Sequence, residues 1–214
     1  MSIKFNDKEY WSKYYREQLE RINKIEPSPF AVFLVKNNYI SKGKKLIELG
    51  CGNGRDSIYF SKCGSLVTAI DQCSNTTKLI NEFENITSYS ADFTTLPDVN
   101  KNDRFDVVYS RFTIHSIDEE GEDRVLNWAF SNLKEGGLFC IEARTLKDPL
   151  YGKGIYKGNN VWFYHNHHRR FIDAIKFKNK IEKIGFKIEL FQESNGLAKY
   201  KNEDPIVMRL IAIK

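Results

Sequence analysis

Three glycines alternate in the stretch ELGCGNGRD, at Gly50, Gly52 and Gly54, directly after a short apolar run. A glycine turn between a strand and a helix can bend sharply and lie against a ligand, because no Cβ intervenes. Such turns hold dinucleotides, phosphates and other nucleoside ligands, and each ligand requires its own spacing. The spacing GxGxG differs from the GxxxxGK[ST] of phosphate loops and from GxGxxG, the dinucleotide fingerprint. This loop therefore predicts a nucleoside ligand without a pyrophosphate.

Acidic residues lie at or near the ends of three successive apolar runs. Glu48 precedes the glycine loop, where it would repel a phosphate and favour a cationic ligand. Asp71 ends the next run, 21 residues after Gly50, close to the spacing at which an acid reaches ribose hydroxyls. Asp92 ends the third run and precedes Phe93, an arrangement that suits the edge and the face of an adenine. Together, these residues predict a ribose-containing ligand that is not an anion.

In combination, the segments ELGCGNGRD, AID and SAD resemble motifs one to three of the class I S-adenosylmethionine-dependent methyltransferases of the small-molecule type. The resemblance extends over roughly residues 45 to 145. It implies that the backbone of the three glycines lies under the methionyl part of S-adenosylmethionine, and that S-adenosylhomocysteine is the product. It also implies that Asp71 holds the ribose and that Asp92 contacts the adenine amine. The other predicted cofactor-binding residues are Glu48, Arg55, Phe93 and Arg111.

The stretch TIHSIDEE follows the fourth apolar run, FDVVYSRF, and the resemblance implies that residues at this position face the methyl group. His115 could accept a proton from a hydroxyl nucleophile, because the ordinary pKa of histidine is close to neutrality. Alternatively, His115 forms hydrogen bonds in the wall of the cofactor pocket. Arg111 could pair with the cofactor carboxylate or with the substrate, or it could be solvated. The sequence leaves these interpretations open, with His115 as the candidate catalytic residue.

A second cluster of polar groups lies in NNVWFYHNHHRRF, after a loop interrupted by glycines. Arginines bind phosphate or carboxylate oxygens through two N–H groups, histidines add donors, and we expect both at the start of a helix, which also favours anions. The stretch therefore predicts an anion site, although an exposed basic loop would have the same composition. A metal site is disfavoured, because HxHH has no carboxylate nearby. The predicted substrate-binding residues of this region are Arg144, His165, His167, His168, Arg169 and Arg170.

Residues 5–25 carry aromatic and apolar residues at three- and four-residue steps, which predicts an amphipathic helix. This segment resembles the N-terminal lid that closes over cofactor and substrate in many small-molecule methyltransferases. Ordinary core contacts would produce the same pattern. The predicted substrate-binding residues on this helix are Trp11, Tyr15 and Arg16.

From Lys45 onward, short β-rich runs alternate with helical patterns, which predicts parallel βαβ units. The predicted fold is α/β, with a Rossmann-like, seven-stranded, mostly parallel sheet that has helices on both faces. The last two runs flank a polar loop without a helix and predict a hairpin with an antiparallel strand at one edge. The predicted strands cover residues 45–50, 66–71, 86–92, 105–112, 137–144, 186–194 and 205–214, and helices are expected over 30–40 and from about residues 56, 74, 118 and 169.

The length of 214 residues predicts a single domain. No window approaches the ~18 to 20 apolar residues of a membrane-spanning helix, and the first residues lack the apolar segment of a signal peptide, so we expect a soluble, cytoplasmic protein. The predicted parts are N-terminal helices with a lid (1–43), a cofactor-binding core (44–145), a substrate loop (146–170), and a C-terminal helix with a hairpin (171–214).

These features predict methyl transfer from S-adenosylmethionine to a small, anionic acceptor, with oxygen as the preferred nucleophile. A phosphorylated or nucleotide-linked acceptor of bacterial surface-polysaccharide biosynthesis is the preferred class, because sequences of this kind occur in those pathways. The net charge of +5 is modest, and the lysines are scattered among 28 acidic residues. This distribution disfavours a nucleic-acid partner, which would call for a concentrated basic surface. The alternatives are an RNA or protein methyltransferase, a non-catalytic cofactor-binding regulator, and an NAD-binding module. RNA base methylation commonly uses an NPPY-type motif where this chain has SRFTIH.

Overall fold

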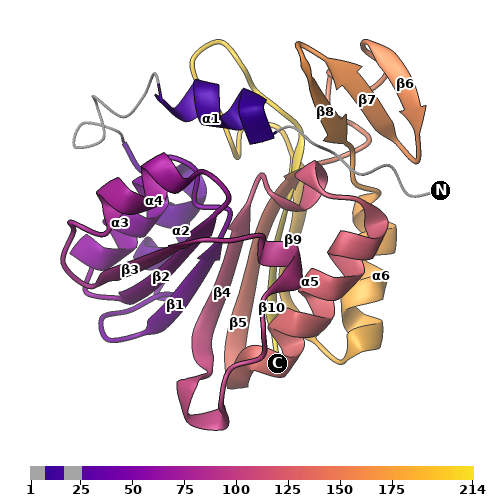
Figure 1. The fold of residues 1–214 in the computed structure, drawn as a ribbon. Coiled ribbons are helices and arrows are strands. Elements are labelled where there is room, and N and C mark those ends of the chain that lie inside the picture. Colours follow the sequence, from indigo (N-terminus) through magenta and orange to yellow (C-terminus); the bar gives the residue numbers. More distant parts are fainter. Residues whose placement is uncertain (1–7, 17–25) are drawn as a thin grey trace.

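A seven-stranded sheet forms the centre of the molecule, with the strand order β3-β2-β1-β4-β5-β10-β9 (Figure 1). The computed structural model describes residues 8–16 and 26–214. Strand β10 is antiparallel to both of its neighbours, so the last two strands form the predicted hairpin at the sheet edge. The predicted fold class is confirmed. The parallel strands are β1 (Lys45–Leu49), β2 (Leu66–Asp71), β3 (Ile86–Ser90), β4 (Phe105–Arg111) and β5 (Leu133–Arg144), and the hairpin consists of β9 (Lys187–Ser194) and β10 (Val207–Ile213).

Helices cover both faces of this sheet, because successive strand residues point to opposite sides and both sets are apolar. Ile47 and Val108 pack in the core beneath α5 and α6, whereas Leu46 and Val107 pack in the core beneath α2, α3 and α4. Helices were correctly predicted near residues 30, 56, 74 and 118. The helices are α2 (Pro29–Lys36), α3 (Arg55–Lys62), α4 (Ser74–Ile80), α5 (Glu119–Asn132) and α6 (Ala174–Ile184), with short 3-10 helices η2 (Phe93–Thr95), η3 (Lys101–Asp103) and η4 (Ile114–Ser116).

A second, three-stranded antiparallel sheet occupies much of the segment predicted as a loop. It consists of β6 (Ile155–Gly158), β7 (Val161–Tyr164) and β8 (His167–Arg170). Its two-residue turns, 159–160 and 165–166, have positive φ angles at both residues, from 47° to 61°. This is the conformation of tight hairpin turns that match the twist of the strands. The predicted helix start near residue 169 is therefore wrong, and α6 begins at Ala174 after the N-cap Asp173.

Helix α1 (Lys8–Arg16) lies across the carboxyl ends of the sheet strands, between α4 and the small sheet (Figure 1). The ring of Tyr10 stacks on that of His167, with centroids 4.4 Å apart, and this contact joins α1 to β8. The predicted helix over residues 5–25 is confirmed for residues 8–16. Its remaining residues, 5–7 and 17–25, lie outside the described part of the chain.

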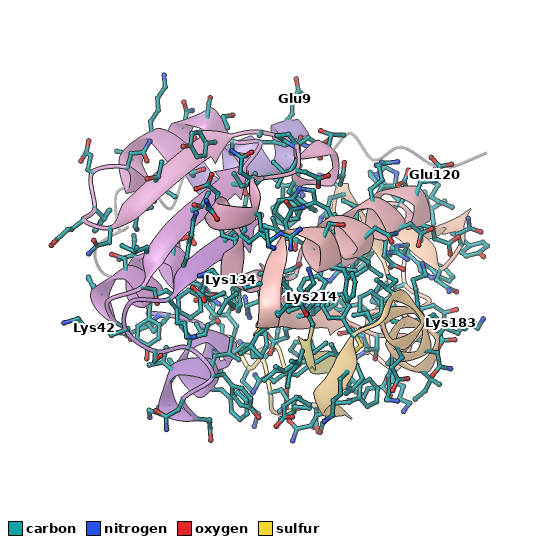
Figure 2. All side chains as sticks on the ribbon, turned by 90° about the horizontal axis from the view of Figure 1, so that it is seen from below. Glu9, Lys42, Glu120, Lys134, Lys183 and Lys214 are labelled. Atoms are coloured by element: carbon teal, nitrogen blue, oxygen red, sulfur yellow. The ribbon has the colours of Figure 1, made fainter. Side chains whose placement is uncertain are left out.

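The charged side chains of Lys42, Glu120 and Lys183 project from the periphery of the molecule (Figure 2). Cys51, Cys73 and Cys140 are buried. Among the described residues, no helix combines the length and the apolar character that crossing a membrane requires. Within the same residues, no three His, Cys, Asp or Glu side chains converge as a metal site.

Candidate active site

A cavity of about 890 Å³ opens at the carboxyl ends of the parallel strands. Its walls come from the loops after β1 to β4, from Arg144 at the end of β5, from α1, from the turn before β8 and β8 itself, and from the loop between β9 and β10. Ligand sites of open α/β sheets lie at this edge, and the volume suits a small-molecule site. The tertiary structure thus gathers into one cavity groups that are far apart in the sequence.

The glycine loop connects β1 to α3 and adopts a conformation that favours glycine. The φ angles of Gly50, Gly52 and Gly54 are +77°, +53° and +74°. A Cβ at Gly50 would collide with the Thr113 methyl group, and a Cβ at Gly54 would collide with the side chain of Ile80. Gly50 itself lines the cavity, whereas the other two glycines shape the loop behind it. Glycine is therefore required here by backbone conformation and by packing within the protein.

Asp71 joins the loops that follow β1 and β2. One of its carboxylate oxygens accepts the Gly52 N–H at 2.8 Å, and the other accepts the Cys73 N–H at 2.9 Å. Asp71 also lines the cavity, as do Asp92 and Phe93 after β3. Asp92 caps η2 and remains exposed. The predicted acids therefore meet at one end of the cavity.

Two further acids, Glu48 and Asp56, form the buried floor of this end. The Ser57 hydroxyl donates to Glu48 at 2.5 Å. Burial and the nearby Asp56 carboxylate raise the pKa of Glu48 well above its ordinary value. Asp56 accepts hydrogen bonds from the Ser28 amide and hydroxyl, both at 2.7 Å, and from the Tyr109 hydroxyl at 2.8 Å. These bonds hold the glycine loop and α3 against α2 and β4.

His115 lies on η4, after β4, and is buried in the cavity wall. Its Nδ1 accepts the main-chain N–H of Arg144 at 3.3 Å. Burial and the charges of Arg144 and Arg169 hold the pKa of His115 well below its ordinary value. A neutral imidazole whose Nδ1 is an acceptor carries its proton on Nε2. This geometry favours a hydrogen-bond donor in the wall over a proton acceptor.

Arginines line the cavity at several positions, and most of them are paired with carboxylates. Arg111 donates to the fully buried Glu142 at 2.9 Å, and Glu142 also accepts from Arg209 at 2.7 Å. Arg144 donates to Asp148 and to Glu203, both at 2.9 Å. Arg144 therefore enters the site with its charge already balanced. The two more distant pairs are Arg55 with Asp56 at 3.8 Å and Arg124 with Glu120 at 4.0 Å.

Phe112 has a strained backbone in the cavity wall, with a φ angle of +58°. Its ring lies beneath the Arg111 guanidinium at 4.2 Å and 5.6 Å from that of Arg144. Its N–H donates to the Glu142 carbonyl at 2.8 Å. A left-handed φ is unusual for a bulky residue, and such residues concentrate at functional sites. The sequence carries no signal for this feature.

The histidine and arginine stretch reaches the cavity through the hairpin turn and β8. His165, His167, His168 and Arg169 line the cavity. Arg170 is not among the cavity-lining residues, and its buried guanidinium donates to the carbonyl oxygens of Ile114 and Ile117. Its guanidinium pairs with Glu122 at 2.5 Å beneath the small sheet. We therefore correct the predicted substrate role of Arg170, which is a buried structural residue, and the predicted helix N-terminus at this stretch.

Helix α1 contributes Trp11, whose ring lies 5.3 Å from that of His167, to the cavity wall. The side chains of Tyr15 and Arg16 lie outside the described part of the chain. The sequence interpretation missed the loop between β9 and β10, which it treated as a plain polar connection. The cavity-lining residues that it missed include Tyr10, Tyr14, Asn53, Asp56, Phe112, Thr113, Ala198, Tyr200, Lys201, Glu203 and Pro205.

A family profile described as "Methyltransferase domain" matches residues 10–190. No curated protein matches the chain significantly. Among solved structures, an S-adenosylmethionine-dependent methyltransferase from Methanosarcina mazei aligns with a TM-score of 0.72 at 16% identity, over 84% of this chain and 96% of that one. The 1,6-didemethyltoxoflavin-N1-methyltransferase from Burkholderia thailandensis, with bound 1,6-didemethyltoxoflavin and S-adenosylhomocysteine, aligns with a TM-score of 0.67 at 16% identity. The alignment covers 96% of this chain and 89% of that one. The [4+2]-cyclase SpnF aligns with a TM-score of 0.65 at 14% identity, over 86% of this chain and 79% of that one.

At these identities the structural matches establish the fold, whereas the family profile covers most of the chain. The profile match, the alternating glycines after β1, and the seven-stranded sheet agree with one another. The chain belongs to the class I S-adenosylmethionine-dependent methyltransferases.

Proposed function

We propose that this methyltransferase acts on a small, anionic acceptor, with oxygen as the nucleophile. A phosphorylated or nucleotide-linked acceptor of surface-polysaccharide precursor biosynthesis is the preferred class. The observation that carries the proposal is the division of one cavity into two ends of different charge. Asp71 and Asp92 lie at the carboxyl ends of β2 and β3, whereas His115 and Arg169 lie beside Arg144 at the end of β5, across β1 and β4 in the sheet. A cationic sulfonium nucleoside suits the first end, and an anionic acceptor suits the second.

At the acidic end, the residues present fit S-adenosylmethionine. Asp71 already accepts two backbone amides, and a carboxylate has about four lone-pair sites, so it retains capacity for ribose hydroxyls. Asp92 and Phe93 would read the edge and the face of the adenine. Gly50 would lie under the methionyl part, and Arg111 would meet its carboxylate. The bound cofactor supplies an electrophilic methyl group on a positively charged sulfur.

At the basic end, the task of the protein is to align the acceptor for an in-line displacement. In such a displacement a lone pair of the acceptor oxygen would form the new bond to the methyl carbon as the C–S bond breaks toward sulfur. A hydroxyl acceptor would release its proton to water, whereas an ionised phosphate or carboxylate oxygen would have none to release. Holding the reacting atoms in line accounts for much of the rate enhancement in such reactions. His115 would contribute its Nε2–H as a donor that orients the acceptor, because its Nδ1 is occupied by the Arg144 amide.

Two alternatives remain distinct from this proposal. An RNA or protein acceptor needs an open approach, and α1 and the loop between β9 and β10 both line the cavity, which favours a small acceptor. The similarity of the fold to the [4+2]-cyclase SpnF shows that this architecture is also found in a protein whose name specifies another reaction. A non-catalytic cofactor-binding regulator would keep the fold and the cofactor end but would show no turnover with any acceptor.

The test is an acceptor screen with S-adenosylmethionine labelled in its methyl group. Phosphorylated sugars, nucleotide-linked sugars, neutral sugars and RNA are incubated with the protein, and S-adenosylhomocysteine and the labelled product are measured. We expect turnover with an anionic small molecule and transfer of the label to oxygen. Turnover restricted to RNA or to neutral acceptors would overturn the acceptor class. Calorimetry with S-adenosylhomocysteine and with NAD tests the identity of the cofactor separately. Preferential binding of NAD would contradict the assignment of S-adenosylmethionine.

A further inference from the structure

Arg169 differs from the other arginines that line the cavity. Arg55, Arg111, Arg124 and Arg144 each have a carboxylate within 4.0 Å. No carboxylate of the described residues lies that close to Arg169, whose guanidinium Nη2 lies 2.7 Å from Nε2 of His167. Arg169 therefore presents a positive charge without a direct carboxylate partner among the described residues, at the cavity wall. A partly buried charge of this kind is costly unless an opposite charge is supplied.

The ring of His167 is held in one orientation and in one tautomer. Its Nδ1 lies 3.1 Å from the carbonyl oxygen of His165, which can only accept, so Nδ1 carries the proton. Its Nε2 is then the acceptor for Arg169. The ring is buried and stacks against Tyr10, with Trp11 beside it. His167 thus fixes the guanidinium of Arg169 without neutralising it.

The electrostatic surroundings of Arg169 agree with a missing anion. Burial and the nearby Arg144 lower the pKa of Arg169 by more than the carboxylates of Asp148 and Glu203 raise it, and a bound anion would oppose both lowering effects. Asp148 and Glu203, the acids in this region, are already bonded to Arg144. Arginine stays protonated even after a moderate shift, so the positive charge persists at neutral pH.

We propose that Arg169 binds the oxyanion group of the acceptor, and that His167 is the positioning residue that holds its guanidinium in place. The inference rests on the proposed function, because it names the residue that recognises the acceptor. The ligand group is a carboxylate or a phosphate, both of which accept parallel N–H bonds from a guanidinium. Tyr10 and Trp11 of α1 contact the ring of His167 and so pack against the residue that holds Arg169.

The experiment is an NMR titration of the protein, saturated with S-adenosylhomocysteine, with inorganic phosphate and in a parallel series with acetate. We expect the Arg169 side-chain Nε–Hε signal and neighbouring amides to shift with one of the two anions. Arg169→Gln should raise the Kd for that anion about tenfold or more. Lys176→Gln, which removes an exposed charge outside the cavity, should leave it unchanged. Stronger binding of phosphate identifies a phosphate-bearing acceptor, and stronger binding of acetate identifies a carboxylate.

His167 variants separate positioning from mere packing. His167→Leu removes the acceptor for Arg169 and should weaken anion binding, whereas His167→Gln can offer its carbonyl oxygen at a similar place and should restore part of the affinity. The Kd for S-adenosylhomocysteine should stay within about twofold in both variants, which also reports that they are folded. The inference is overturned if neither anion binds or if Arg169→Gln keeps wild-type anion affinity. Failure of S-adenosylhomocysteine to bind would instead count against the proposed function, and anion binding can still be measured without it.

Discussion

The main-chain N–H of Arg144 donates to Nδ1 of His115 across 3.3 Å, where β5 ends beside η4. This bond occupies the nitrogen that a base would use and leaves the proton on Nε2. Because burial and neighbouring cations hold the pKa of His115 low, the ring remains neutral at physiological pH. His115 is thus arranged to donate a hydrogen bond, and its titration should be visible in stability.

His115→Gln should reduce the acid sensitivity of the fold. The folded pKa lies well below the ordinary 6.5, so below about pH 6.5 the unfolded chain binds a proton at this residue that the folded protein does not. The free energy of unfolding therefore falls as pH falls through this window, by at most about 1.4 kcal/mol per pH unit from this group. Urea unfolding at about pH 7.5, 6.5 and 5.5 measures the slope. Equal slopes for the variant and the wild type would contradict the assignment.

Asp71→Ala should weaken binding of S-adenosylhomocysteine by about 2 kcal/mol, or roughly 30-fold in Kd, through lost charge-assisted hydrogen bonds. The variant also releases the Gly52 and Cys73 amides that Asp71 holds. Asp71→Asn keeps an oxygen that can accept one of the two amides, so this variant should lose less affinity for S-adenosylhomocysteine than Asp71→Ala. Calorimetry provides the measurement, and Asp123→Ala, an exposed acid outside the cavity, is the matched control. Unchanged affinity in Asp71→Ala would rule out its role at the ribose.

Gly50→Ala should destabilise the protein by about 1–3 kcal/mol, because the new Cβ meets the Thr113 methyl group and the φ angle is +77°. Thr113→Ser removes that methyl group and keeps the hydroxyl bonded to Ser110 at 2.5 Å. The double variant should recover the steric part of the loss and keep the backbone part. Urea unfolding of the four proteins forms a double-mutant cycle. Strict additivity would show that the two side chains do not clash.

Glu142→Gln should lower the free energy of unfolding by about 3–5 kcal/mol, since among the described residues Glu142 is the carboxylate bonded to both Arg111 and Arg209. Its loss leaves a buried cation at Arg209 and a partly buried one at Arg111. Glu193→Gln is the control, because Glu193 pairs with the exposed Lys147 and should lose less than about 1 kcal/mol. Thermal and urea unfolding compare the two variants. Equal losses would show that the buried carboxylate does not balance the arginines.

Much of the fold was predictable, because each strand and each helix of the sheet core has a local pattern. Strand β2 has the same boundaries as predicted, since apolar β-branched residues lie between the helix patterns on either side. The glycine loop and the acids Asp71 and Asp92 were predictable for the same reason: they immediately follow strands, and the carboxyl ends of parallel strands meet at one edge.

The small sheet was not predicted, because its two-residue turns, Asn159-Asn160 and His165-Asn166, lack the glycine that usually marks such hairpins. Without these turns, Arg169 and Arg170 look equivalent in the sequence. Strand β8 separates them, placing one in the cavity wall and the other against Glu122.

By itself, then, the sequence determined the sheet, the glycine loop and the acidic end of the cavity, since these depend on periodicity and on residues adjacent to their own strands. Only the tertiary structure decided which arginines are neutralised, which nitrogen of His115 carries the proton, and which loops close the cavity. These properties depend on partners distant in the sequence, such as Glu142 for Arg111 and the Arg144 amide for His115. Charge compensation and hydrogen-bond pairing between distant segments arise from packing, which local patterns do not encode.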